Sequence, residues 1–132
     1  MPYAHWPLVL GRPVIDIILT LAQGGQKVKR TLLADTGAGS MYSPFELLLD
    51  ETDCLLCDGT VTQTITLGGA YSSTYPIYLI HVQMPSLQFN HDVLAVGVPN
   101  TPESMDGIAC FRFLNRFNYG NFGNPVAFGL DT

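Results

Sequence analysis

The feature that most constrains the fold is a pair of apolar, β-branched segments separated by a short polar turn with two glycines. Residues 13–21 and residues 28–34 flank the turn Gln23-Gly24-Gly25-Gln26. Such a pattern predicts two antiparallel strands that form a hairpin. The second strand is charged in its outer half and apolar in its inner half, and it continues directly into Asp35.

The middle of the chain predicts a second, longer hairpin. Residues 60–67 alternate with a period of two, which is typical of a strand with one face open to water. Gly68-Gly69 interrupts this pattern, and a strand resumes over residues 75–82, so the hairpin has a mobile glycine tip. Further short strands are expected at residues 87–89, 93–96 and 126–130. Strands therefore dominate, and the sequence predicts an all-β fold.

Two short helices are expected among these strands. Ser43 followed by Pro44 resembles a helix cap with proline at the first helical position, and this predicts a helix over residues 43–49. Residues 108–117 have apolar side chains at helical spacing and are expected to end as a helix. We expect loops at residues 35–40, 50–59 and 99–104, and a turn-rich segment at residues 119–124.

Length and charge limit the classes of function. The 132 residues fit one domain, 1–132. The net charge is −5 and no run of Lys or Arg exists, so nucleic acid is not an expected partner. The most apolar stretch, residues 14–22, is too short to span a membrane, so no membrane association is expected. With no signal peptide visible we expect a cytoplasmic protein, although a domain excised from a longer precursor would show the same absence.

The three cysteines do not form a recognisable metal site. Cys54 and Cys57 make one C-x-x-C pair, whereas a closed zinc site needs four ligands. His81 and His91 lie at no ligand-like spacing from that pair. We therefore expect no metal and no cofactor, two loop cysteines in a reducing compartment, and a buried Cys110.

Asp35-Thr36-Gly37 is the candidate for chemistry. An apolar strand that ends in a carboxylate, followed by small residues, places that carboxylate at a fixed position. The alternative is that Asp35 only caps its own turn through an Asx-type hydrogen bond, and this segment alone does not separate the two interpretations. Peptide hydrolysis by carboxylates needs two of them, and the chain has one such tripeptide. A two-fold dimer would bring two copies of Asp35 together, because an isologous contact matches a residue with itself.

Four segments, in order, resemble the retroviral-like (retropepsin-type) aspartic proteases. Residues 33–38 resemble the catalytic loop, and residues 40–44 its continuation. Residues 64–78, with Gly68-Gly69, resemble the flap hairpin. Residues 106–114 resemble the Asp-Gly-Ile segment that leads into the family helix, and residues 126–130 the last strand. The resemblance covers about residues 13–131.

The resemblance implies a closed acid-protease β-barrel with one or two short helices, equivalent to one lobe of a pepsin-like enzyme. It implies an aspartic endopeptidase that acts as a homodimer on a peptide or protein substrate. Asp35, Thr36 and Gly37 would be catalytic. The substrate-binding residues would come from the loop and from the flap tip: Ala38, Gly39, Leu67, Gly68, Gly69 and Ala70.

One departure from the family keeps a second interpretation open. The family usually has glycine where Cys110 stands, beneath the catalytic loop. A catalytically weak or inactive barrel of the same fold, used for peptide binding or dimerisation, is therefore the alternative. An unrelated β-barrel that binds a ligand would leave the ordered match of the four segments unexplained.

Overall fold

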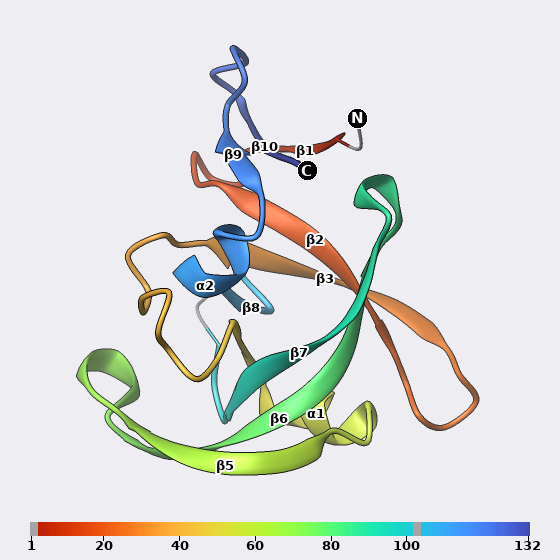
Figure 1. The fold of residues 1–132 in the computed structure, drawn as a ribbon, viewed down its shortest axis with the longest axis vertical. Helices are drawn as coiled ribbons and strands as arrows, with labels where there is room; N and C mark the ends of the chain where they lie inside the picture. Colours follow the sequence, from red (N-terminus) through yellow and green to blue (C-terminus); the bar gives the residue numbers. More distant parts are fainter. Residues whose placement is uncertain (1–2, 102–103) are drawn as a thin grey trace.

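The structure is a computed structural model, and it describes residues 3–101 and 104–132. Strands make up most of it, together with two short α-helices and two 3-10 turns (Figure 1). The strands are β1 (Tyr3–Pro7), β2 (Val14–Thr20), β3 (Lys27–Ala34), β4 (Leu47–Asp50), β5 (Thr60–Leu67), β6 (Ser73–Met84), β7 (Phe89–Val98), β8 (Gly107–Ala109), β9 (Asn118–Gly120) and β10 (Ala127–Asp131). The helical elements are α1 (Glu51–Leu56), α2 (Phe111–Leu114), η1 (Gly69–Tyr71) and η2 (Pro85–Leu87).

Six strands form a closed barrel. Their order is β2-β3-β8-β4-β7-β6, and β2 returns to pair with β6 at Ile18 and Leu19, which closes the ring. β3 pairs with β8, and β4 with β7, in parallel, whereas the other neighbours are antiparallel. β5 is added outside the ring at the edge of β6. The prediction of an all-β fold with short helices is confirmed at this level.

A separate three-stranded sheet, ordered β1-β10-β9, joins the two ends of the chain. β1 and β10 are antiparallel, with Tyr3 opposite Asp131 and Trp6 opposite Phe128. The ends of the described chain therefore lie close together at one end of the molecule, at the top of Figure 1. The sequence predicted the last strand but not β1 or β9.

The predicted first hairpin is confirmed, and its alternation explains the core. Ile15, Ile17 and Leu19 are fully buried on the inside of β2, while Asp16 and Ile18 lie half-buried on the other face. In a strand, successive side chains point to opposite faces, so this pattern fixes which face lines the barrel.

The predicted helix over residues 43–49 is wrong. Leu47, Leu48 and Leu49 form β4 in the barrel wall, where β7 and β8 pair with them on either side. All three leucines are buried, and this burial overrides the helical preference of leucine. The helix begins instead at Glu51, because Asp50 caps it by accepting a 2.8 Å hydrogen bond from the Thr52 N–H.

Other boundaries also differ from the predictions. The segment expected to be a loop at residues 50–59 contains α1, on which Cys54 is buried, and Cys57 is its C-cap. Leu87 lies in η2 rather than in a strand, because Pro85 turns the chain and Gln88 takes a left-handed conformation (φ 54°). The strand expected at residues 93–96 is longer and begins at Phe89. Part of the loop expected at residues 99–104, residues 102–103, lies outside the described residues.

Candidate active site

Asp35 lies directly after β3, in the barrel wall. β3 becomes buried over its last three residues, and its neighbour there is β8. The Asp35 N–H donates to the Ala109 carbonyl at 3.0 Å, which extends the β3–β8 pairing by one residue. The side chain of Asp35 is half-buried. Two buried strands therefore fix the position of this carboxyl group.

The carboxyl group itself is anchored on one side. Oδ1 accepts a 2.9 Å hydrogen bond from the Gly37 N–H, and the Ala38 N–H donates to the Asp35 carbonyl at 3.2 Å. This is the Asx-type turn that the sequence left open as an alternative. In the part of the chain that the structure describes, Oδ2 has no hydrogen-bond partner, so one oxygen is held and the other is available.

The loop after Asp35 is held from below by α2. The Ala38 carbonyl accepts a 2.9 Å hydrogen bond from the Phe111 N–H. Farther along, the Ser40 N–H donates to the Ser43 hydroxyl at 2.8 Å, and the Ser43 carbonyl accepts from Arg112 Nη1 at 2.8 Å. These contacts tie the loop to the segment that precedes β4.

The sequence did not indicate the supporting roles of Ser43 and Arg112. Ser43 was interpreted as a helix cap, whereas its hydroxyl closes the loop. The glycine-rich spacing contained a clue, because Gly39 has φ +74° and a Cβ there would lie 2.7 Å from the Ser43 hydroxyl oxygen. Glycine is needed there both for its backbone conformation and for this close approach.

The second hairpin meets this loop through an apolar cluster. Its buried members come from the segment before β4, from β4, β6 and β7, and from the residue before α2: Phe45, Leu48, Ile77, Val96, Val98 and Cys110. Ala38 of the loop packs on this cluster, and so do Ile65, Leu67, Tyr71 and Tyr75 of the hairpin. The loop after β3 and the end of the β5–β6 hairpin lie on the same side of the barrel in Figure 1.

The structure thus brings some of the predicted site residues together. Ala38 and Leu67 contact one apolar cluster, and Asp35 lies three residues from Ala38. Thr36, Gly37 and Gly39 are exposed on the loop. Gly68 and Gly69 are exposed at the hairpin tip, with open space where a Cβ would stand. The side chain of Ala70 lies outside what the structure describes.

The Cys110 thiol lies against the candidate site, and it is buried as expected (2% exposed). Burial raises its pKa to about 12, and the charge of Asp35 adds to this effect. A buried, protonated thiol is chemically inert, since the thiolate is the reactive form. Cys110 therefore acts here as an apolar side chain of the cluster on which Ala38 packs.

The Cys54–Cys57 pair lies on another part of the molecule. Burial raises the pKa of Cys54 to about 12 and also raises the pKa of Cys57, so neither thiol has the low pKa of a redox-active cysteine. Within residues 3–101 and 104–132, no group of three or more His, Cys, Asp or Glu side chains is arranged to hold a metal ion.

Two cavities formed by the described residues are notable, and Asp35 lines neither of these two. One has a volume of about 160 Å³ and lies between β1, β2 and the end of β6. The other, of about 360 Å³, is polar and is lined by Arg30 and Asp53, which form a two-point ion pair at 2.8 and 3.0 Å.

No helix in the described parts of the chain is long and apolar enough to cross a membrane. No known family model matches the chain, and comparison with curated proteins finds no match.

Proposed function

We propose that the chain is one half of a dimeric aspartic endopeptidase of the retropepsin type. The observation that carries the proposal is the setting of Asp35. It ends a buried barrel strand, Oδ1 is anchored by the Gly37 N–H, and Oδ2 is available. A carboxylate held in this way can meet a reactant at a defined position.

The chemistry requires a second carboxylate, and a two-fold axis beside Asp35 would supply it. Two carboxyl groups about 3 Å apart share one proton, because both cannot be ionised at that distance. The ionised group takes a proton from water, and the protonated group polarises the scissile carbonyl. The exposure of Thr36 and Gly37 supports this arrangement, because a partner's loop needs access to them.

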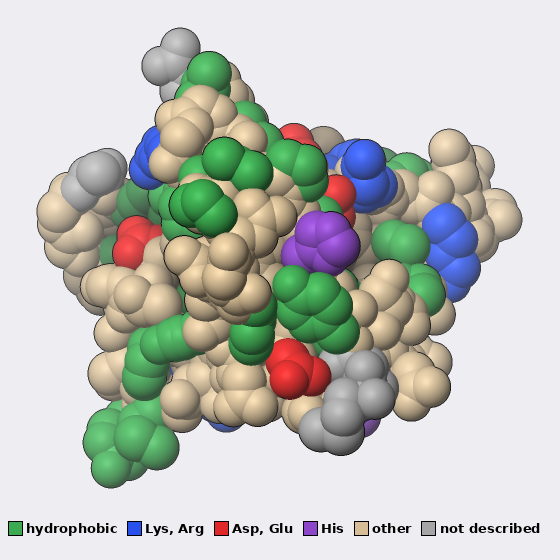
Figure 2. Space-filling model, turned by 90° about the horizontal axis from the view of Figure 1, so that it is seen from above, with side chains coloured by type: hydrophobic (Ala, Val, Ile, Leu, Met, Phe, Trp, Pro, Cys, Tyr) green, Lys and Arg blue, Asp and Glu red, His purple; other side chains and the backbone are tan. Residues whose placement is uncertain are grey.

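The exposed apolar side chains support an association between copies. Tyr3, Tyr119, Phe122 and Val126 belong to the three-stranded sheet and the loop within it, and they are between 37% and 67% exposed. Figure 2 shows hydrophobic side chains gathered on the end of the molecule that is seen from above. Contiguous exposed apolar surface is typical of a protein–protein interface.

The β5–β6 hairpin fits the role of a flap. β5 was expected to have one covered face, yet six of its eight residues are exposed and only Ile65 and Leu67 are half-buried. Those two side chains lie over the same apolar cluster as Ala38. A hairpin with open space at its glycine tip can close over an extended peptide and add strand-type hydrogen bonds.

The test is Asp35→Asn, with Asp58→Asn as a matched control. Asp58 is exposed and has φ 54°, a conformation that asparagine tolerates, so the control changes one surface charge without strain. The wild type is expected to cleave a denatured protein at mildly acidic pH, because a shared-proton pair titrates below neutral. Asp35→Asn should lower the rate about a thousand-fold or more while the circular dichroism spectrum stays unchanged.

Equal cleavage by Asp35→Asn and the wild type would contradict the proposal. Sedimentation of the wild type adds a second criterion, because a fully active monomer would contradict the argument from one carboxylate per chain.

Cys110 favours a second candidate, the non-catalytic barrel of the same fold, since its side chain fills the space beneath the loop. In that case, the wild type would dimerise and bind peptide without cleaving it.

A further inference from the structure

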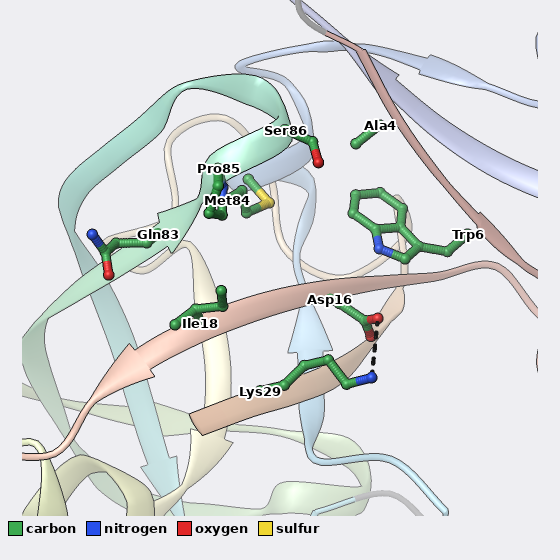
Figure 3. Close-up of a pocket in the computed structure, with 9 residues that line it drawn as sticks. All are labelled: Ala4, Trp6, Asp16, Ile18, Lys29, Gln83, Met84, Pro85 and Ser86. Carbon is green, nitrogen blue, oxygen red and sulfur yellow. Dashed lines mark ion pairs between the residues drawn. The ribbon is translucent and has the colours of Figure 1, made fainter. Parts of the chain in front are cut away.

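The cavity of about 160 Å³ lies outside the barrel, away from Asp35. Figure 3 shows it between the first strand, the outer face of β2 and the end of β6. The Trp6 indole extends from β1 toward Met84, and Asp16 and Lys29 lie below the indole in this view (Figure 3).

The local course of the chain explains why this cavity exists. β2 and β6 pair only at Ile18↔Gln83 and Leu19↔Val82. In that register the next partner of Asp16 would be Pro85, but Pro85 begins η2 and turns the chain away. The pairing therefore ends at Ile18, and the two strands separate toward Asp16. Trp6 of β1 covers the resulting gap, and the other walls come from β2, β3, the end of β6 and η2.

The walls combine an apolar surface with two opposite charges. Trp6, Ile18 and Met84 supply the apolar part. Asp16 is held in place, because its Oδ1 accepts a 2.7 Å hydrogen bond from the Thr31 hydroxyl. Its other oxygen, Oδ2, is 3.9 Å from Lys29 Nζ, and this loose ion pair is part-exposed on Asp16 and mostly exposed on Lys29.

We propose that this cavity binds a free α-amino acid with a large apolar side chain. The ligand's ammonium group would pair with Asp16, its carboxylate would pair with Lys29, and its side chain would lie against Trp6 and Met84. A dry cavity of about 150 Å³ holds a benzene molecule, so the volume here suits a ring or a branched aliphatic group. The loose Asp16–Lys29 pair complements a zwitterion, whose two charged groups are attached to the same carbon atom.

The chain offers a direct probe, because Trp6 is its single tryptophan. L-phenylalanine should produce a saturable change in tryptophan fluorescence, excited at a wavelength that spares tyrosine. Three analogues separate the charges: phenylalanine amide lacks the carboxylate, N-acetylphenylalanine lacks the ammonium, and N-acetylphenylalanine amide lacks both. Each lost charge should weaken binding about fivefold, the upper range for an exposed ion pair.

Two variants connect the affinity to the named side chains. Asp16→Asn should weaken L-phenylalanine about fivefold but leave N-acetylphenylalanine unchanged. Lys29→Met, which keeps most of the aliphatic stem, should weaken L-phenylalanine similarly but leave phenylalanine amide unchanged. Circular dichroism checks that each variant is folded.

Two results would overturn the proposal: no saturable fluorescence change with L-phenylalanine, or equal affinity for the zwitterion and the doubly capped analogue. The second result would show that the cavity binds the apolar side chain without recognising the ammonium or the carboxylate group. If only N-acetylphenylalanine or only phenylalanine amide binds, a peptide end rather than a free amino acid is the ligand, and the proposal is wrong in its ligand class. None of these outcomes depends on peptidase activity.

Discussion

The loop after β3 and the end of the β5–β6 hairpin contact the same apolar cluster, yet the chain builds them in opposite ways. The Asp35 loop follows a strand that is buried over its last three residues, and β8 and α2 each donate to it or accept from it. The hairpin end extends beyond the barrel, and β5 has only one neighbouring strand, β6. One region is fixed by its surroundings, and the other is held chiefly by its own pairing.

Two glycines show the same contrast at the level of atoms. A Cβ on Gly107, in β8 beside β3, would lie 2.2 Å from the backbone oxygen of Leu48. A Cβ on Gly68, at the hairpin tip, would meet nothing within 4 Å. The contrast suits the proposed function, because a catalytic carboxylate needs a rigid support whereas a flap must open and close.

The largest expected effect is that of Gly107→Ala. The added methyl group would overlap a backbone atom of β4, which moves only if the barrel wall moves, and it would also approach Leu49 and Leu32 at 3.0 and 3.1 Å. Overpacking of this kind should lower the free energy of unfolding by about 3 kcal/mol or more. Urea unfolding followed by circular dichroism measures this change.

If Gly107→Ala proved as stable as the wild type, β8 would not be packed as tightly as the contrast requires. The same variant tests why the residue after Asp106 is a glycine. Asp106 is tied to β3 by two 2.9 Å hydrogen bonds with the backbone of Thr31. Glycine is required at position 107 because the backbone of β4 approaches it so closely.

The parts of the fold that the sequence predicts well are those with a strict local pattern. The first hairpin has β-branched residues around a glycine turn, and the second has a period of two and a glycine tip. In both, the local pattern and the tertiary position agree. Asp35 was found for the same reason, since it follows the most apolar part of a clearly patterned strand.

The sequence did not predict the elements whose conformation is determined by tertiary contacts. Leu47-Leu48-Leu49 has no period that separates a strand from a helix, and only the neighbours β7 and β8 select the strand. β1 is a strand because the other end of the chain, β10, pairs with it. The support of the loop by Arg112 and the cavity beneath Trp6 likewise join residues more than ten positions apart, which no local pattern reports.

An effect that is absent at neutral pH is expected from the alkaline titration of Cys110. An unfolded cysteine ionises near its ordinary pKa of 9.0, whereas the buried thiol keeps its proton up to about pH 12. The contribution of this thiol to stability is therefore present below pH 9 and is lost as the pH rises from 9 to 12. The loss is at most about 1.4 kcal/mol per pH unit for one thiol.

Cys110→Ala should remove this component, so the stability of the variant should fall less steeply than that of the wild type above pH 9. Urea unfolding at several pH values measures both slopes. Cys57→Ala is the matched control, because Cys57 is only half-buried and its pKa is raised less. Identical slopes for Cys110→Ala and the wild type would show that the region beneath Asp35 admits water and is not the fixed support described above.

The smallest effect is expected from Gly68→Ala, at the tip of the β5–β6 hairpin. Gly68 has φ −107° and ψ −177°, an extended conformation open to any residue, and a Cβ there has free space. The free energy of unfolding should therefore change by less than about 0.5 kcal/mol. Gly69→Ala is the informative neighbour, because Gly69 has φ +68° and alanine should cost about 1 kcal/mol there through its backbone conformation alone.

A loss above 1 kcal/mol for Gly68→Ala would mean that the tip packs against the rest of the chain. The hairpin end would then be as fixed as the Asp35 loop, and the proposed flap would have no free end to move.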